Sequence, residues 1–173
     1  GAVLYAGGNF LIVGGVQATG IARWDGSNWS ALGSGVQLGS FFGGVRALAV
    51  FDDGAGPALF VGGEITEAGG QAVANIARWD GSSWSALDQG VSGVWDSSVK
   101  ALTVFDDGSG PALYVGGNFT VAGGASVTVK KIARWDGSSW SALGDGIDEG
   151  STDKSVRALA VFDDGGGPAL YVG

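Results

Sequence analysis

Cysteine, histidine and methionine are all absent from this chain of 173 residues. Without histidine and cysteine, the Ser-His-Asp triad, the Cys-His pair and the usual zinc sites are excluded. No disulfide can form, so the cysteine content does not indicate the redox compartment of the protein. The sequence therefore predicts no metal ion, no cofactor and no enzymatic activity.

Positive charge and long apolar runs are also scarce. The chain has 9 Lys and Arg against 17 Asp and Glu, a net charge of −8. Nucleic acid is therefore not an expected partner, because phosphate binding needs clustered basic residues. No apolar run approaches the roughly 20 residues of a membrane span. Acidity, together with abundant Thr, Ser, Asn and Gly, favours an extracellular or cell-surface location. The absent initiator Met and signal peptide suggest a processed or truncated chain, or a segment of a longer one.

The composition that remains is that of a packed β protein. Apolar residues make up 45% of the chain, with 7 Trp and 8 Phe, which is enough for one hydrophobic core. The 35 Gly fit many tight turns. We therefore expect an all-β chain with residues 1–173 in a single repeat domain.

Three near-copies of one unit run through the chain and are out of frame with its ends. Ala-Arg-Trp-Asp-Gly-Ser occurs at 22–27, 77–82 and 133–138, and Phe-Asp-Asp-Gly at 51–54, 105–108 and 162–165. The resulting period of 54 to 57 residues divides the chain into 1–20, 21–75, 76–131 and 132–173. Self-similar units bury their apolar faces against each other, so this period predicts the architecture.

Local signals predict four short strands in each unit, which we call a, b, c and d. They are represented by 156–162, 111–115, 131–135 and 140–143, separated by Gly-rich turns and by loops. Four antiparallel strands in roughly 50 residues are typical of a β-propeller blade. The chain starts and ends at strand b, which gives thirteen strands, one more than three blades require.

The repeated motif resembles the kelch repeat. The segment Leu113-Tyr-Val-Gly-Gly117, followed by Arg134-Trp-Asp136 and Trp140, matches its double glycine, aromatic-Asp pair and downstream Trp. It departs from kelch in having Trp before Asp and in the added Phe-Asp-Asp-Gly-x-Gly-Pro hairpin. Similar tandem arrays occur in bacterial secreted proteins. The resemblance implies a β-propeller.

Three blades are too few for a propeller ring, since the smallest usual ring has about four. Further blades are therefore the expected partners. Identical chains could assemble into a ring of roughly six or nine blades, or the rest of a longer chain could supply the missing blades. The second copy of strand b favours the longer chain.

The repeated side chains are interpreted as blade construction. We expect Asp52-Asp53 and its equivalents to hold turns, with calcium binding as the alternative. Each repeat arginine is expected to pair with the Asp two residues later on the same strand face, with carboxylate recognition as the alternative. The tryptophans are expected to fill the space between blades, with sugar stacking as the alternative. Exchange of Tyr for Phe at the strand b aromatic indicates that its hydroxyl is dispensable. These structural residues are Arg23, Arg78, Arg134, Trp24, Trp29, Trp79, Trp84, Trp135 and Trp140.

Variation between repeats is confined to the b-c and d-a loops, which are expected on one face of the ring, opposite the a-b and c-d turns. Loops on a rigid scaffold often carry recognition. The candidate binding residues are Phe41, Phe42, Trp95, Asp145, Asp148, Glu149 and Asp153. The alternative is that these loops drift because nothing packs on them.

The function predicted from these patterns is a non-catalytic propeller scaffold for protein interaction or self-assembly. A lectin-like propeller that uses the tryptophan pairs or Trp95 is the first alternative. A carboxylate glycosidase is the second, and it would need two acidic residues from different blades beside one cleft.

Overall fold

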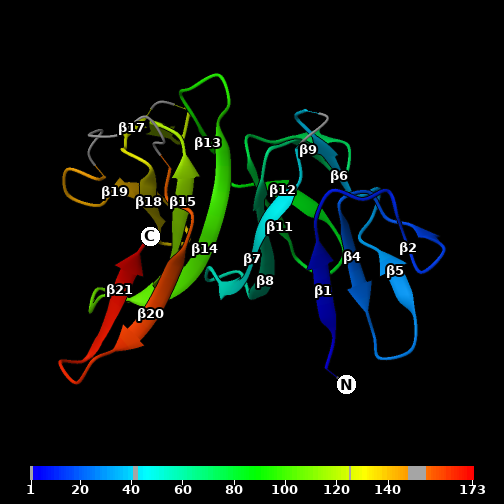
Figure 1. The fold of residues 1–173 in the computed structure, drawn as a ribbon, viewed down its shortest axis with the longest axis horizontal. Helices are drawn as coiled ribbons and strands as arrows, with labels where there is room; N and C mark the ends of the chain where they lie inside the picture. Colours follow the sequence, from blue (N-terminus) through cyan, green and yellow to red (C-terminus); the bar gives the residue numbers. More distant parts are fainter. Residues whose placement is uncertain (1, 41–42, 125, 148–154) are drawn as a thin grey trace.

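The computed structural model describes residues 2–40, 43–124, 126–147 and 155–173. These residues form antiparallel β-sheets and contain no helix, so the predicted all-β class is confirmed. No helix long and apolar enough to cross a membrane is found in the described part. Successive sheets lie side by side from the N-terminal to the C-terminal side of the molecule (Figure 1).

Among the described residues, thirteen strands build four sheets that follow the sequence repeat, and we call these repeat sheets I to IV. Sheet I contains β1 (Leu4–Gly7), β4 (Ile21–Trp24) and β5 (Trp29–Ala31). Sheet II contains β7 (Val45–Asp52), β8 (Pro57–Gly63), β11 (Ile76–Trp79) and β12 (Trp84–Ala86). Sheet III contains β14 (Ser98–Asp106), β15 (Pro111–Asn118), β18 (Ile132–Trp135) and β19 (Trp140–Ala142). Sheet IV contains β20 (Leu159–Asp163) and β21 (Pro168–Val172). The predicted a-b-c-d order is confirmed in sheets II and III.

The remaining eight short strands belong to the b-c and d-a loops. They are β2 (Ile12–Val13), β3 (Val16–Gln17), β6 (Val36–Leu38), β9 (Ile65–Ala68), β10 (Gln71–Ala72), β13 (Val91–Ser92), β16 (Val121–Ala122) and β17 (Val127–Thr128). The order β10-β9-β6 joins the first d-a loop to the b-c hairpin of sheet II, and β13-β16-β17 repeats this at sheet III. We call these two the linking sheets.

The linking sheets contradict the idea that nothing packs on the variable loops. Val36, Ile65, Val91 and Ala122 are buried in them. The Val36 amide also donates to Thr19 O at 3.0 Å, so this segment connects the b-c loops of sheets I and II. The pairing places the described parts of the b-c and d-a loops on one side, as predicted.

Adjacent repeat sheets are brought together by the first glycine of the Gly-Gly pair in strand b. A Cβ at Gly62 would overlap Val99 of sheet III, and a Cβ at Gly116 would overlap Val156 before sheet IV. Gly7 has the same relation to Val45. Because only glycine leaves room there, each strand b accepts a valine from the strand a that follows in the next repeat.

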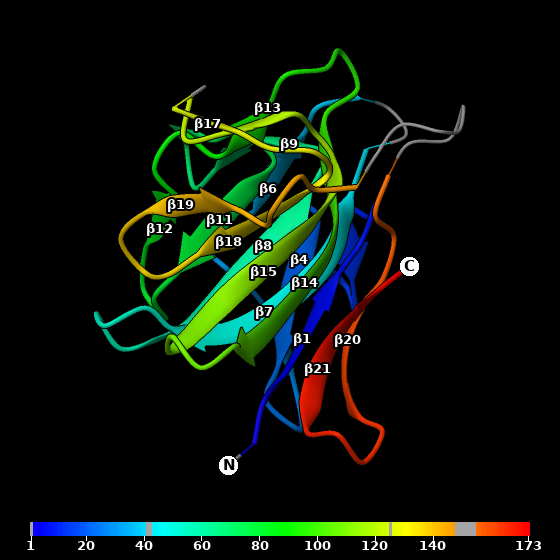
Figure 2. The same ribbon diagram turned by 90° about the vertical axis from the view of Figure 1, so that its left-hand side faces the viewer.

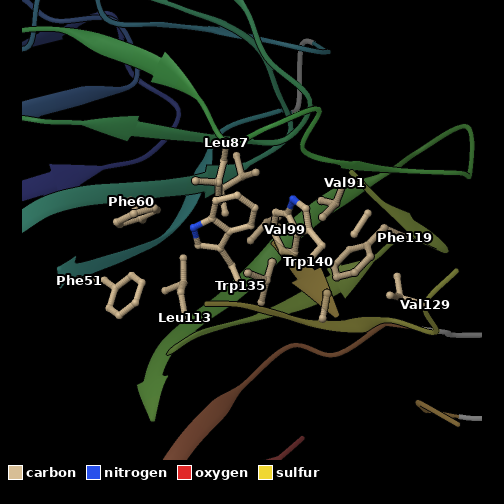
Figure 3. Close-up of a cluster of buried hydrophobic side chains, with 14 of the residues drawn as sticks. Phe51, Phe60, Leu87, Val91, Val99, Leu113, Phe119, Val129, Trp135 and Trp140 are labelled. Carbon is tan, nitrogen blue, oxygen red and sulfur yellow. The ribbon is translucent and has the colours of Figure 1, made fainter. Parts of the chain in front are cut away.

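Hydrophobic clusters fill the spaces between sheets I and II and between sheets II and III. In the cluster between sheets II and III, Trp135 and Trp140 pack with Phe51, Phe60 and Leu87 of the preceding repeat (Figure 3). Each Trp pair is tilted, with ring centroids 5.2 Å apart in sheets II and III. The Trp84 indole also donates to Leu32 O at 2.8 Å. The predicted packing role of these tryptophans is confirmed in sheets II and III.

A β-bulge interrupts each strand a at the same position. The register shifts between Val45 and Ala47 in sheet II and between Val99 and Ala101 in sheet III. In sheet IV, the amides of Arg157 and Ala158 both donate to Gly173 O, at 2.7 and 2.9 Å. A bulge inserts one extra residue and redirects its side chain. Here the extra residue is Arg46, Lys100 or Arg157.

Gly62→Ala should lower the free energy of unfolding by about 1–3 kcal/mol, because the added methyl group overpacks the contact with Val99. Urea denaturation measures this change. Val99→Ala makes room for the added methyl group. The double variant should therefore lose at least about 1 kcal/mol less free energy of unfolding than the sum of the two single losses. Additive costs would contradict the contact.

Candidate functional site

Trp95 is the most exposed large apolar residue among those described, with 97% of its surface accessible. It lies in the loop between β13 and β14, where the chain turns tightly. Ser97 Oγ donates to Val94 O at 2.7 Å, and the Val94 amide donates back to Ser97 Oγ at 3.1 Å. The loop is therefore held by its own hydrogen bonds while its indole points into solvent.

A polar chain ties the Trp95 loop to the adjacent b-c loop. Asn118 Nδ2 donates to Asp96 Oδ1 at 2.7 Å, and Lys131 Nζ donates to Asn118 Oδ1 at 2.9 Å. Lys131 is almost fully buried, so this link is anchored in the protein. A loop that is already ordered loses less entropy on binding than a disordered one, which suits a recognition role.

The other predicted binding residues do not complete a site with Trp95 in the described structure. Asp145 is exposed, and no hydrogen bond or ion pair among the described residues joins it to Trp95. The remaining candidates lie outside the described residues: Phe41, Phe42, Asp148, Glu149 and Asp153. Of the predicted set, the structure thus supports Trp95 as a displayed side chain.

The paired aspartates form the a-b turns, as predicted. Asp52 Oδ1 accepts from the amides of Gly54 and Gly56 at 3.0 and 3.1 Å, and Asp106 and Asp163 repeat this arrangement. The second aspartate of each pair accepts from the amide two residues later. No group of three or more metal-ligating side chains is found among the described residues.

The predicted pairing of each repeat arginine with the Asp two residues later is wrong for Arg78 and Arg134. Arg78 instead binds both oxygens of Asp53 in the a-b turn, at 2.6 and 3.1 Å. Arg134 lies 3.8 Å from Asp107 and donates to Ser109 Oγ at 2.8 Å. The b-c strand pairing brings these turns next to strand c, which no short sequence window reveals.

Both the strand b aromatic and the turn residue at 55 or 109 differ between sheets II and III, and so does the contact of arginine with the turn. In sheet III the Tyr114 hydroxyl donates to Asp107 at 2.9 Å, whereas sheet II has Phe60 and a bidentate Arg78–Asp53 pair. The tyrosine hydroxyl, expected to be dispensable, is thus hydrogen-bonded in sheet III. The hydroxyl and the amide of Ser109, followed by the Tyr114 hydroxyl, lower the pKa of Asp107 to about 2.

The aspartates after the repeat tryptophans stabilise the c-d turns. Asp80 accepts from the hydroxyl and amide of Ser83, which lower its pKa, and the Ser138 and Ser139 amides lower that of Asp136. The amide of Asn28 lowers the pKa of Asp25. All of these shifts favour the ionised form. A glycosidase acid needs the opposite shift, so these carboxyl groups do not suit that role.

The tryptophan pairs are poorly placed for sugar stacking in sheets II and III, where all four side chains are buried. Trp24 and Trp29 of sheet I are partly exposed. The difference arises because the Trp pair faces the preceding repeat sheet.

A cationic pocket lies along the strands a, and the sequence analysis did not predict it. Arg46, Lys100 and Arg157 line a space of about 360 Å³. They come from β7, β14 and the residues just before β20. Strand β14 lies beside β7 (Figure 2) and also contacts β20. The signal was a basic residue at the same place in every strand a, in a chain with only 9 basic residues.

The chain matches no family model, no curated protein and no solved structure.

Acid should weaken the fold through Asp107. Its folded pKa of about 2 lies below the ordinary value of 3.8, so its ionised form adds stability above pH 4 that is lost as pH falls through about 2. Between pH 4 and pH 2, the free energy of unfolding measured by urea denaturation at fixed ionic strength should therefore fall less for Asp107→Asn than for the parent protein. Asp145→Asn, an exposed change of the same type, serves as the control. Parallel curves for the parent and Asp107→Asn would refute the effect.

Proposed function

We propose that this chain is a non-catalytic, kelch-like β-propeller unit that binds further repeats of its own kind and presents a recognition surface on its loop side. The observation that carries the proposal is the exposure of repeat-equivalent residues. Leu4 is 59% exposed, whereas Leu59 is 4% exposed at the equivalent place. Phe162 is 60% exposed, whereas Phe51 is 4% exposed.

The exposed faces at Leu4 and at Phe162 correspond to the two opposite sides of a contact between neighbouring sheets. The leucine of strand b packs toward the preceding sheet, as Leu59 does in the cluster between sheets I and II. The phenylalanine of strand a packs toward the following sheet, as Phe51 does against Trp135. Phe105, which is followed by the two-stranded sheet IV, has intermediate burial. The burial of each face thus follows how much of a neighbouring repeat covers it.

Strand edges support the same partner. Among the described residues, β1 pairs only with β4, whereas its equivalents β8 and β15 also pair with a strand a. On the other side, within the part of the chain that the structure describes, β21 pairs only with β20 and has no strand c beside it. Open edges of this kind recruit further strands. Repeats from an identical chain or from a longer chain would fill both edges and extend the array toward a closed ring.

The loop side is the proposed recognition surface for other proteins. The linking sheets pair the loops that form this surface, and the hydrogen bond from Asn118 to Asp96 fixes the Trp95 loop on it. Exposed, preorganised aromatic residues are typical anchors of protein interfaces. The opposite side carries aspartates already engaged in turns, which leaves them less suited to new contacts.

Adding the missing strands c and d to sheet IV tests the repeat-binding proposal. A copy of residues 117–143 appended after Gly173 should pair with β21 and cover Tyr171, which is 42% exposed against 2% for Tyr114. Burial of apolar surface should then raise the melting temperature by about 4 °C or more. An appended segment of the same composition in scrambled order is the matched control. Equal melting temperatures for the two extensions would contradict the proposal.

A lectin-like propeller is the second candidate, because Trp95 offers a free aromatic face. If it binds sugars, Trp95→Ala should abolish signals on a glycan array while changing the free energy of unfolding by less than about 0.5 kcal/mol. We expect instead no sugar-dependent signal for the parent protein. A signal that Trp95→Ala removes would overturn the scaffold proposal in favour of the lectin.

A further inference from the structure

We propose that sheet IV of one copy of this chain completes sheet I of a second copy, because β20 pairs with β1 of the second copy in place of its own β21. This exchange is one form of the repeat binding proposed above, on which it rests. It names a second copy of the chain as the partner and fixes which strands meet and in which register.

A pocket of about 280 Å³ lies between sheets I and II, and Leu59 and Trp79 of sheet II line it. Their equivalents in sheet III, Leu113 and Trp135, pack in one cluster with Phe51 from strand a of sheet II (Figure 3). The described part of sheet I contains no strand a, so no equivalent phenylalanine reaches the pocket from that sheet. The pocket therefore corresponds to the place that the end of a strand a occupies one repeat later.

The turns beside this pocket repeat the same difference. A Cβ at Gly137, in the c-d turn of sheet III, would lie 2.5 Å from Asp53 O in the a-b turn of sheet II. At Gly81, the equivalent residue of sheet II, an added Cβ would have nothing within 4 Å. An a-b turn thus fits against the c-d turn of the following sheet, and at sheet II this place is open.

Sheet IV carries the segment that fits the pocket. Its strand a, β20, includes Phe162, which is exposed. The sequence Val-Phe-Asp-Asp-Gly is identical at 161–165 and at 50–54, where the phenylalanine is buried. Because the two segments are identical, β20 of a second copy offers the side chain and the turn that the pocket between sheets I and II can accept.

Exchanging β21 for β1 preserves the strand pairing. Leu170-Tyr171-Val172 of β21 pairs with 159–161 of β20, and β1 presents Leu4-Tyr5-Ala6 at the equivalent place. In the exchanged register, Val161 would face Leu4 of the second copy, as Val50 faces Leu59 in sheet II. The backbone hydrogen bonds lost at one strand b are thus formed again at the other.

Of the two copies of strand b, β21 is the easier to displace. It packs mainly on β20, whereas β1 packs on β7 as well as on β4. Gly7 of β1 also accepts Val45 of sheet II in close contact. For Gly173, at the equivalent place after β21, the nearest described neighbour of an added Cβ is Ala158, at 3.9 Å. Strand β1 is therefore fixed by sheet II, and β21 is held by its hairpin partner.

Charge complementarity supports the same partner. Arg78 of sheet II binds Asp53 in the a-b turn beside it, and the strand c arginine of sheet III lies beside its turn in the same way. Arg23 is the equivalent arginine of sheet I, and no ion pair of its guanidinium is found within the described residues. Asp164 is the equivalent turn aspartate of sheet IV, which has no strand c among the described residues. The exchange would place Asp164 beside Arg23 of the second copy.

The contact is head-to-tail, because each copy donates β20 at one end and accepts it at the other. Trp24 and Trp29 of sheet I are partly exposed and would face sheet III of the donating copy, as Trp135 and Trp140 face sheet II. Leu4 would be covered from the same side. One contact thus covers the exposed apolar groups at both ends of the repeat array.

Sedimentation velocity of the whole chain between about 1 and 200 μM tests the contact. Arg23→Glu alone and Asp164→Arg alone should each weaken self-association about fivefold or more, because each brings like charges together. The double variant restores an opposite pair at the parent's net charge and should associate within about twofold of the parent. Trp95→Ser, which removes an exposed apolar side chain from the loop side, is the control and should leave association unchanged.

A cross-link tests the exchange of strands itself. The parent has no cysteine, so Val161→Cys combined with Leu170→Cys can form only one disulfide within a chain, the one that holds β21 on β20. The oxidised variant should self-associate about tenfold more weakly than the same variant after reduction. Because both forms share one sequence, a folding defect of the variant cannot produce this difference.

Three results would overturn the exchange. They are equal association of the oxidised and reduced forms, no association of the parent up to about 200 μM, and opposite effects of Arg23→Glu and Asp164→Arg. The last result would indicate diffuse repulsion between acidic chains, since the two changes shift the net charge in opposite directions. The appended-strand experiment tests repeat binding separately, so the exchange can fail while the proposed function stands.

Discussion

The contact between a strand b glycine and a valine of the next repeat is the constraint on which the rest of the structure depends. Gly7, Gly62 and Gly116 each leave room for a valine, and any Cβ there would overlap it. This close approach sets the spacing of the repeat sheets, lets Trp135 and Trp140 reach the preceding sheet, and places the strands a next to each other. A single absent side chain per repeat therefore governs the packing of the whole array.

The same contact connects construction to the cationic pocket. With the valine held in the intersheet core, the bulge at the following residue directs Arg46, Lys100 and Arg157 to a shared space. On the turn side, Arg78 and Arg134 are directed into the a-b turns. Five of the 9 basic residues thus fall into two groups: Arg78 and Arg134 have a structural role at the turns, and the other three line a pocket along the strands a.

Local patterns were enough to predict the four strands of each repeat and the turn role of Asp52, Asp106 and Asp163, because each feature depends on residues close in sequence. The partner of Arg78 could not be predicted in this way. Asp53 lies 25 positions earlier and reaches Arg78 only through the pairing of β8 with β11. The linking sheets escaped prediction because their strands, two to four residues long, carry too little periodicity to be recognised.

The sequence by itself determined the all-β class, the repeat period and the residues that terminate each strand, since backbone preferences of Gly, Pro and Asp act locally. It also excluded every chemistry that needs histidine or cysteine. Only the tertiary structure decided which side chains meet: Tyr114 competes with arginine for a turn carboxylate, Trp95 is displayed, and three basic residues far apart in sequence line one pocket. The physical reason is that sheet packing, bulges and strand register set these distances, and none of them is encoded in a single local segment.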